Sequence, residues 1–173
     1  MTLPAKYNIA FKGLAEGSHE FDFVIEKKFF DYFAGGIAED GNVNVKVTLE
    51  KQSALMVLWF HVNGTVKIQC DRCLDPFDQP VESENKIFIK FGDESFDEGD
   101  DVLWVSQGDN VINVAKLIYD FIILSIPIRH AHKNEKDCNP AMLEKLSGIN
   151  ENETPSEETD SRWDELKKLL DNK

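Results

Sequence analysis

Alternation of apolar and polar residues predicts β-strands in the first half of the chain. Residues 43–49 alternate strictly between valine or leucine and a polar residue, which is typical of a strand with one buried and one solvated face. Residues 19–25 and 86–91 alternate in the same way with single departures, and residues 7–11 and 102–105 are shorter candidates. The first hundred residues therefore favour a sheet.

A nearly continuous apolar run, residues 54–62, is followed by Asn63-Gly64. Both central positions of a type I′ turn require positive φ, which asparagine and glycine tolerate best, so this dipeptide is the strongest short hairpin signal. The pattern predicts a two-residue turn here, after which residues 65–69 return antiparallel and lead directly into Cys70.

One long helix is predicted over residues 111–125. Most of the segment is apolar, Asp109 or Asn110 can cap its start, and Pro127 ends it. Its polar residues fall three and four positions apart on one stripe, namely Asn113, Lys116 and Asp120. A shorter helix is predicted over residues 26–33, whose three phenylalanines recur at helical spacing and are interpreted as core.

These elements predict an α+β fold, a twisted antiparallel sheet in a meander that could close into a barrel-like form, packed by the one long helix. Residues 1–146 are expected to form a single domain. Residues 147–160 are polar and acidic and predict a flexible linker. Residues 161–173 predict a terminal amphipathic helix with Trp163 and Leu166 on its apolar face.

The chain is strongly acidic, with 32 acidic and 19 basic residues and a formal net charge of -13. Proteins that follow a phosphate backbone neutralise it with lysine and arginine, so this balance opposes broad nucleic-acid binding and suits a basic protein partner. Solubility alone is an alternative explanation of the charge. Neither a secretory signal nor an apolar run of about 20 residues is visible, so we expect a cytoplasmic protein without a membrane partner.

Three cysteines suggest a metal site. Cys70 and Cys73 form a Cys-x-x-Cys motif after a predicted strand, and a tight turn can bring two such thiolates to one point. Cys138 follows His130 and His132. Three thiolates and either histidine would complete a closed four-ligand zinc site, which would attach the segment after the long helix to the sheet. Alternatively, Cys138 is an incidental small residue and the histidines lie on the surface.

Catalysis is not expected. A redox Cys-x-x-Cys normally opens a helix whose N-terminus lowers the thiol pKa, whereas this motif leaves a strand and is followed by Asp75 and Pro76. No P-loop, dinucleotide-binding glycine pattern, H-E-x-x-H or G-x-S-x-G motif occurs. The alternative to a non-enzymatic binding protein is a thiol redox or metal-handling protein that uses Cys70 and Cys73.

The cysteine motif also carries a family resemblance. The pattern Val-x-x-x-Cys-x-Arg-Cys-Leu-x-x-Phe, which spans residues 66–77, resembles the large ribosomal RNA subunit accumulation proteins, the YceD-like family of bacteria and plastids. An acidic loop at residues 93–101, a mostly apolar helix that ends at residues 126–128, and a C-terminal Arg-Trp-x-x-Leu-Lys-x-Leu pattern at residues 162–169 agree with it.

The resemblance implies a non-enzymatic factor that supports accumulation or assembly of large-subunit ribosomal RNA, and it brings no catalytic residues and no small-molecule substrate. Many relatives carry a second Cys-x-x-Cys after the helix; this chain has only Cys138 there, so zinc binding would depend on a histidine. The expected partners are a large-subunit ribosomal protein, ribosomal RNA, or both. The candidate binding residues are Arg72, Arg129, Lys133, Lys136, Arg162, Trp163 and Leu166.

Overall fold

The structure, a computed structural model, describes residues 3–33, 35–53, 55–92 and 101–151. The chain divides into two compact units, residues 1–131 and residues 132–173. The described residues are mostly sheet with few helices, so the predicted α+β class is confirmed. Among these residues, no helix is long and apolar enough to cross a membrane.

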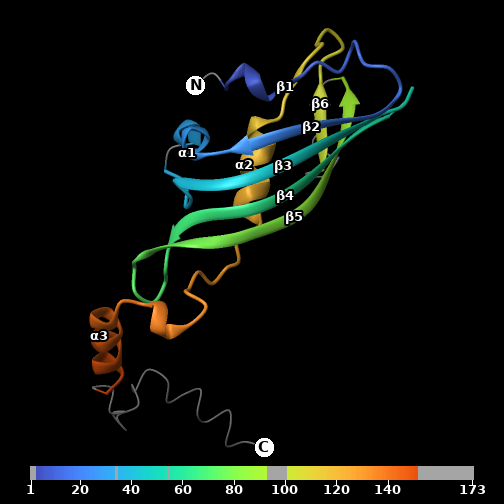
Figure 1. Cartoon of the computed structure of the whole chain (residues 1–173). Helices are drawn as coiled ribbons and strands as arrows, with labels where there is room; N and C mark the ends of the chain where they lie inside the picture. Colours follow the sequence, from blue (N-terminus) through green and yellow to red (C-terminus); the bar gives the residue numbers. More distant parts are fainter. Residues whose placement is uncertain (1–2, 34, 54, 93–100, 152–173) are drawn as a thin grey trace, which may run out of the picture. The chain divides into compact units, whose positions relative to one another are not determined.

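The main sheet of the first unit has five strands, β2 (Gly17–Ile25), β3 (Asp40–Lys51), β4 (Met56–Gln69), β5 (Pro76–Phe91) and β6 (Val102–Val105), in the order β2-β3-β4-β5-β6. Neighbouring strands from β2 to β5 are antiparallel, which confirms the predicted meander (Figure 1). β6 is parallel to β5, so the expectation of a wholly antiparallel sheet is wrong at this edge.

The sheet is open. Within the part of the chain that the structure describes, β2 and β6 each pair with a single neighbour and not with each other, so no barrel closes. A barrel requires its first and last strands to share hydrogen bonds along their length. β6 spans only 4 residues and is already paired with β5. The barrel-like alternative is therefore wrong.

The predicted hairpin at Asn63-Gly64 is also wrong, because both residues lie inside β4. Val43 is the partner of Gly64 on β3, and Gly64 is not among the residues with positive φ. A Cβ atom at this position would clash with the carbonyl oxygen of Asn42. Glycine is therefore required here by the close approach of two strands and not by a turn, and the reversal from β4 into β5 takes place at the cysteines.

A small two-stranded sheet precedes the main helix and changes its expected start. η1 (Ala5–Tyr7) leads into β1 (Asn8–Ile9), which pairs with β7 (Ile112–Asn113), and α2 then spans Ala115–Leu124. The N-cap residue is Val114, and not Asp109 or Asn110. The side-chain oxygen of Asn113, one residue earlier, accepts a hydrogen bond from the Ala115 N–H at 3.1 Å. With 10 residues, α2 is shorter than the long helix predicted over residues 111–125.

The core of the first unit lies between the sheet and α2, which packs on β4 and β5 (Figure 1). The ring centroids of Phe60 on β4 and Phe121 on α2 are 4.9 Å apart. α1 (Lys27–Phe30) and η2 (Asp31–Phe33) add the predicted phenylalanine cluster, in which Phe29 and Phe30 are buried. Burial of one such side chain contributes about 1.5–3 kcal/mol. The four alternating apolar residues of β3 are all buried: Val43, Val45, Val47 and Leu49.

The described part of the second unit contains η3 (Glu135–Asp137) and α3 (Pro140–Glu151). The side-chain oxygen of Asn139 accepts a hydrogen bond from the Ala141 N–H at 3.1 Å, which satisfies one of the free donors at the start of α3. α3 includes residues 147–151, the beginning of the segment expected to be a linker. The predicted terminal helix lies outside the described residues.

Candidate metal centre

The Cys-x-x-Cys motif forms the turn between β4 and β5. The Cys70 N–H donates to the Asp75 carbonyl at 3.0 Å, and the Leu74 N–H donates to the Cys70 carbonyl at 2.8 Å. Leu74 has a φ of 61°, and this left-handed conformation allows the short turn to close. A residue other than glycine adopts it at a cost of about 1 kcal/mol. Cys70 and Cys73 are both buried and form no disulfide. The turn thus directs two thiols inward.

Asp71, between the two cysteines, holds the chain that follows α2. Its N–H donates to the His130 carbonyl at 2.6 Å, and its Oδ2 accepts from the His130 N–H at 2.7 Å. Its Oδ1 lies 3.5 Å from the His130 Nδ1. We call this reciprocal pair the Asp71–His130 clamp. No local sequence pattern predicts it, because the two residues are far apart in the chain.

In the second unit, His132 and Cys138 meet around η3. The Cys138 N–H donates to the Glu135 carbonyl at 3.0 Å, and the Asp137 N–H donates to the Asn134 carbonyl at 3.2 Å. These bonds fold the segment back, so that the Cys138 Sγ lies 3.5 Å from the His132 Nδ1. Cys138 is buried and is not oxidised to a disulfide.

Three cysteines and one histidine of the described chain are of the kind that could hold a metal ion: Cys70 and Cys73 in the first unit, and His132 and Cys138 in the second. A tetrahedral zinc ion with bonds of about 2.3 Å to sulfur keeps its ligands about 3.8 Å apart, which is close to the 3.5 Å between the Cys138 Sγ and the His132 Nδ1. Three soft thiolates and an imidazole are also the donor types that zinc prefers.

The sequence left the choice of histidine open. His132 lies beside Cys138 in the second unit, whereas His130 contacts Asp71 in the first. A zinc ion with four protein ligands has no free position for substrate, which is the pattern of a structural and not a catalytic metal site.

The candidate binding residues are more dispersed. Arg72 is half-buried in the cysteine turn, while Arg129, Lys133 and Lys136 are exposed. Arg162, Trp163 and Leu166 lie outside the described residues. The binding role of all seven candidate residues stays a prediction. Sequence reasoning singled out the three cysteines and both histidines but missed Asp71 as a positioning residue.

The described residues form an α+β scaffold with a cysteine turn between β4 and β5. The family model described as large ribosomal RNA subunit accumulation protein YceD matches residues 58–170, which contain the three cysteines and His132. The chain therefore belongs to the YceD family. The family is named for the accumulation of ribosomal RNA and not for a reaction. No curated protein and no solved structure matches the chain.

Proposed function

We propose that this protein is a cytoplasmic, non-enzymatic ribosome-biogenesis factor that supports accumulation or assembly of large-subunit ribosomal RNA. The observation that carries the proposal is the family match, which covers residues 58–170. The factor acts by binding a basic ribosomal protein or a local RNA element, since a chain with a net charge of -13 repels an extended RNA backbone.

Zinc is the proposed cofactor, held by Cys70, Cys73, His132 and Cys138. The burial of the three thiols and the 3.5 Å separation between Cys138 Sγ and His132 Nδ1 support it. Zinc has no redox chemistry of its own and supplies a cross-link between its ligands. The Asp71–His130 clamp fixes the chain two residues before His132, the proposed histidine ligand, and so reduces the conformational freedom of that residue before metal binds.

A thiol redox or metal-handling function of Cys70 and Cys73 is the second candidate, and it is favoured by the two closely spaced cysteines of the motif, which form no disulfide. Two observations oppose it. Reactive cysteines are partly exposed, whereas these thiols are buried. The motif also occupies a strand-to-strand turn, so no helix N-terminus stabilises a thiolate.

The proposed function is tested by depleting the protein in growing cells and measuring the ratio of large-subunit to small-subunit ribosomal RNA. We expect the ratio to fall on depletion and to recover with the wild-type chain, but to recover much less with Cys70→Ser and Cys73→Ser together. A matched control, Ser53→Ala at an exposed loop position, should restore the ratio fully. An unchanged ratio in depleted cells would contradict the proposed function.

A further inference from the structure

A second, smaller apolar cluster lies on the face of the sheet opposite the core. Met56, Leu58 and Phe60 of β4 point into the core, so the alternating positions 57 and 59 point to the other face. Val57 is only 8% exposed although it is not part of the core cluster. Trp59, beside it, is 43% exposed. This face therefore carries apolar side chains that the α2 layer does not cover.

The strand register extends the cluster across the sheet. Val57 is the partner of Phe88 on β5, and Phe88 is in turn the partner of Val102 on β6. Trp59 is the partner of Lys86. Directly opposed residues point to the same face, so three strands contribute to one surface.

Lysine amino groups lie over the rings of this surface. The Lys86 Nζ is 5.9 Å from the ring centroid of Trp59 and 5.3 Å from that of Phe88. On the neighbouring pair, the Lys90 Nζ is 5.8 Å from the ring centroid of Trp104. Cations at this distance from an aromatic face are attracted to it. We call Trp59, Lys86, Phe88 and Trp104 the aromatic platform.

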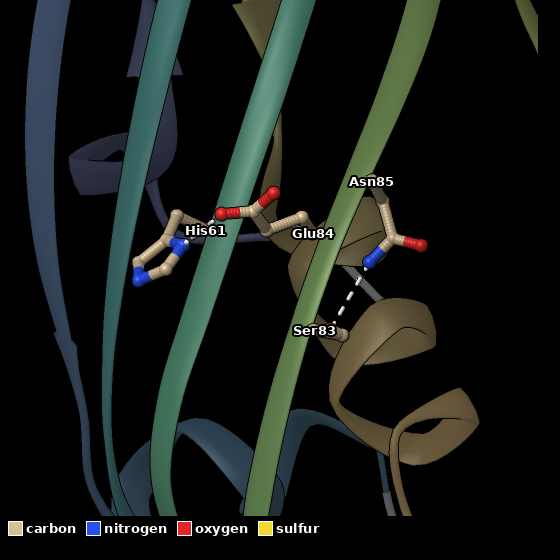
Figure 2. Close-up of polar contacts among 4 residues, drawn as sticks. All are labelled: His61, Ser83, Glu84 and Asn85. Atoms are coloured by element: carbon tan, nitrogen blue, oxygen red, sulfur yellow. Dashed lines mark hydrogen bonds and ion pairs between the residues drawn. The ribbon is translucent and has the colours of Figure 1, made fainter.

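Lys86 makes no ion pair with any carboxylate of the described residues, so its positive charge is not neutralised there. Glu84, two positions away on the same face, points instead to His61, whose Nδ1 lies 3.2 Å from the Glu84 Oε1 (Figure 2). Ser83 and Asn85 lie on the opposite face of β5, where the Asn85 Nδ2 donates a hydrogen bond to the Ser83 Oγ at 3.1 Å. By contrast, Lys46 on the same face pairs with Glu20 at 3.2 Å. A positive site thus remains beside the exposed ring of Trp59 and the half-buried ring of Phe88, in a chain that is acidic overall.

We propose that the aromatic platform binds single-stranded RNA, with bases stacked on Trp59 and Phe88 and a phosphate bound by Lys86. Aromatic rings on the surface of a sheet can stack with bases of any sequence, and adjacent cations can bind the phosphates of the RNA backbone. A basic protein segment would be repelled by the same lysine. This inference rests on the proposed function and specifies its RNA element: a few unpaired nucleotides, because Glu84 and Glu20 border the platform on the same face.

The test is a fluorescence titration of the full chain with a labelled ten-nucleotide single-stranded RNA and with the same sequence in a duplex. Stacking should quench tryptophan emission for the single strand and not for the duplex. Trp59→Ala should weaken binding about tenfold or more, and Trp59→Tyr should restore most of it. Lys86→Met should lower the slope of log affinity against log salt by about 0.7, the value for one phosphate contact on a single strand.

Lys46→Ala, on the same face but ion-paired, is the matched control and should leave affinity unchanged. Thermal unfolding of each variant checks folding, and the exposed position of Lys86 keeps the test valid if Trp59→Ala fails to fold. Equal affinity of wild type, Trp59→Ala and Lys86→Met would overturn the inference. Loss of a bound basic ribosomal protein and not of RNA in these variants would overturn it as well.

Failure of this inference is distinguishable from failure of the proposed function. If Trp59→Ala restores the ribosomal RNA ratio in depleted cells, the platform is dispensable while the proposed function stands. If depletion leaves the ratio unchanged but the single strand still binds at Trp59, the proposed function fails and the platform stands.

Discussion

Asp71 and His130 hold each other by both backbone and side chain. The Asp71 N–H donates to the His130 carbonyl at 2.6 Å, and the Asp71 carboxylate accepts from the His130 N–H at 2.7 Å. The carboxylate comes from the middle of the Cys-x-x-Cys turn, and His132 follows the second partner by two residues. A residue that is not itself a predicted ligand therefore fixes the chain two residues before His132.

Replacing Asp71 tests the clamp. Asp71→Ala removes the bond from the His130 N–H while leaving the backbone bond in place, so we expect a loss of about 1 kcal/mol, or about 2–4 °C in Tm. Asp71→Asn keeps an acceptor and should recover most of the loss. Asp75→Ala in the same turn is the control, because its side chain bonds to no described residue. Equal Tm values for Asp71→Ala and Asp75→Ala would show that the clamp contributes nothing.

Gly64 is expected to be intolerant of any side chain. A Cβ atom there would meet the backbone of Asn42 and Val43, which cannot move without breaking the pairing of β3 and β4. We predict that Gly64→Ala destabilises the chain by about 2–3 kcal/mol in urea unfolding. Gly13→Ala, where nothing lies within 4 Å of the added atom, should change stability by less than about 0.5 kcal/mol. A Gly64→Ala variant as stable as Gly13→Ala would contradict the close approach of β3 and β4 at this position.

The sequence predicted what depends on local pattern. The alternation of Val43, Val45 and Val47 identified the buried face of β3, and the phenylalanine spacing identified the α1 cluster. The predictions from sequence were wrong where contacts between residues distant in the chain determine the local conformation. Asn63-Gly64 stays extended because it is paired on both sides, with β3 and with β5.

The start of α2 and the candidate site show the same division. Ile112 and Asn113 fit a helical stripe, yet β1 pairs with them and delays the helix. The cysteines and histidines of the candidate metal centre could be singled out as a set because soft donor residues are few in this chain, whereas the contact of His132 with Cys138 and of His130 with Asp71 could not. Trp59 was overlooked because it lies in a nearly continuous apolar run, in which the side chains that point outward cannot be recognised from the sequence.

Metal removal separates the zinc site from the redox alternative. Zinc-bound thiolates are protected from alkylation, so native protein should react slowly with iodoacetamide until a chelator is added, and then at three cysteines. The chelator should also lower Tm by about 10 °C, which corresponds to a loss of about 3 kcal/mol in a chain of this size. Rapid alkylation without a chelator would favour the redox function.

The metal content of the native chain, measured by native mass spectrometry together with elemental analysis, is the most direct test of the zinc site. We predict one zinc ion per wild-type chain, one in His130→Ala, and a strongly reduced content in His132→Ala and Cys138→Ser. A metal-free wild-type chain purified without chelators, or full zinc content in both His132→Ala and Cys138→Ser, would contradict the account.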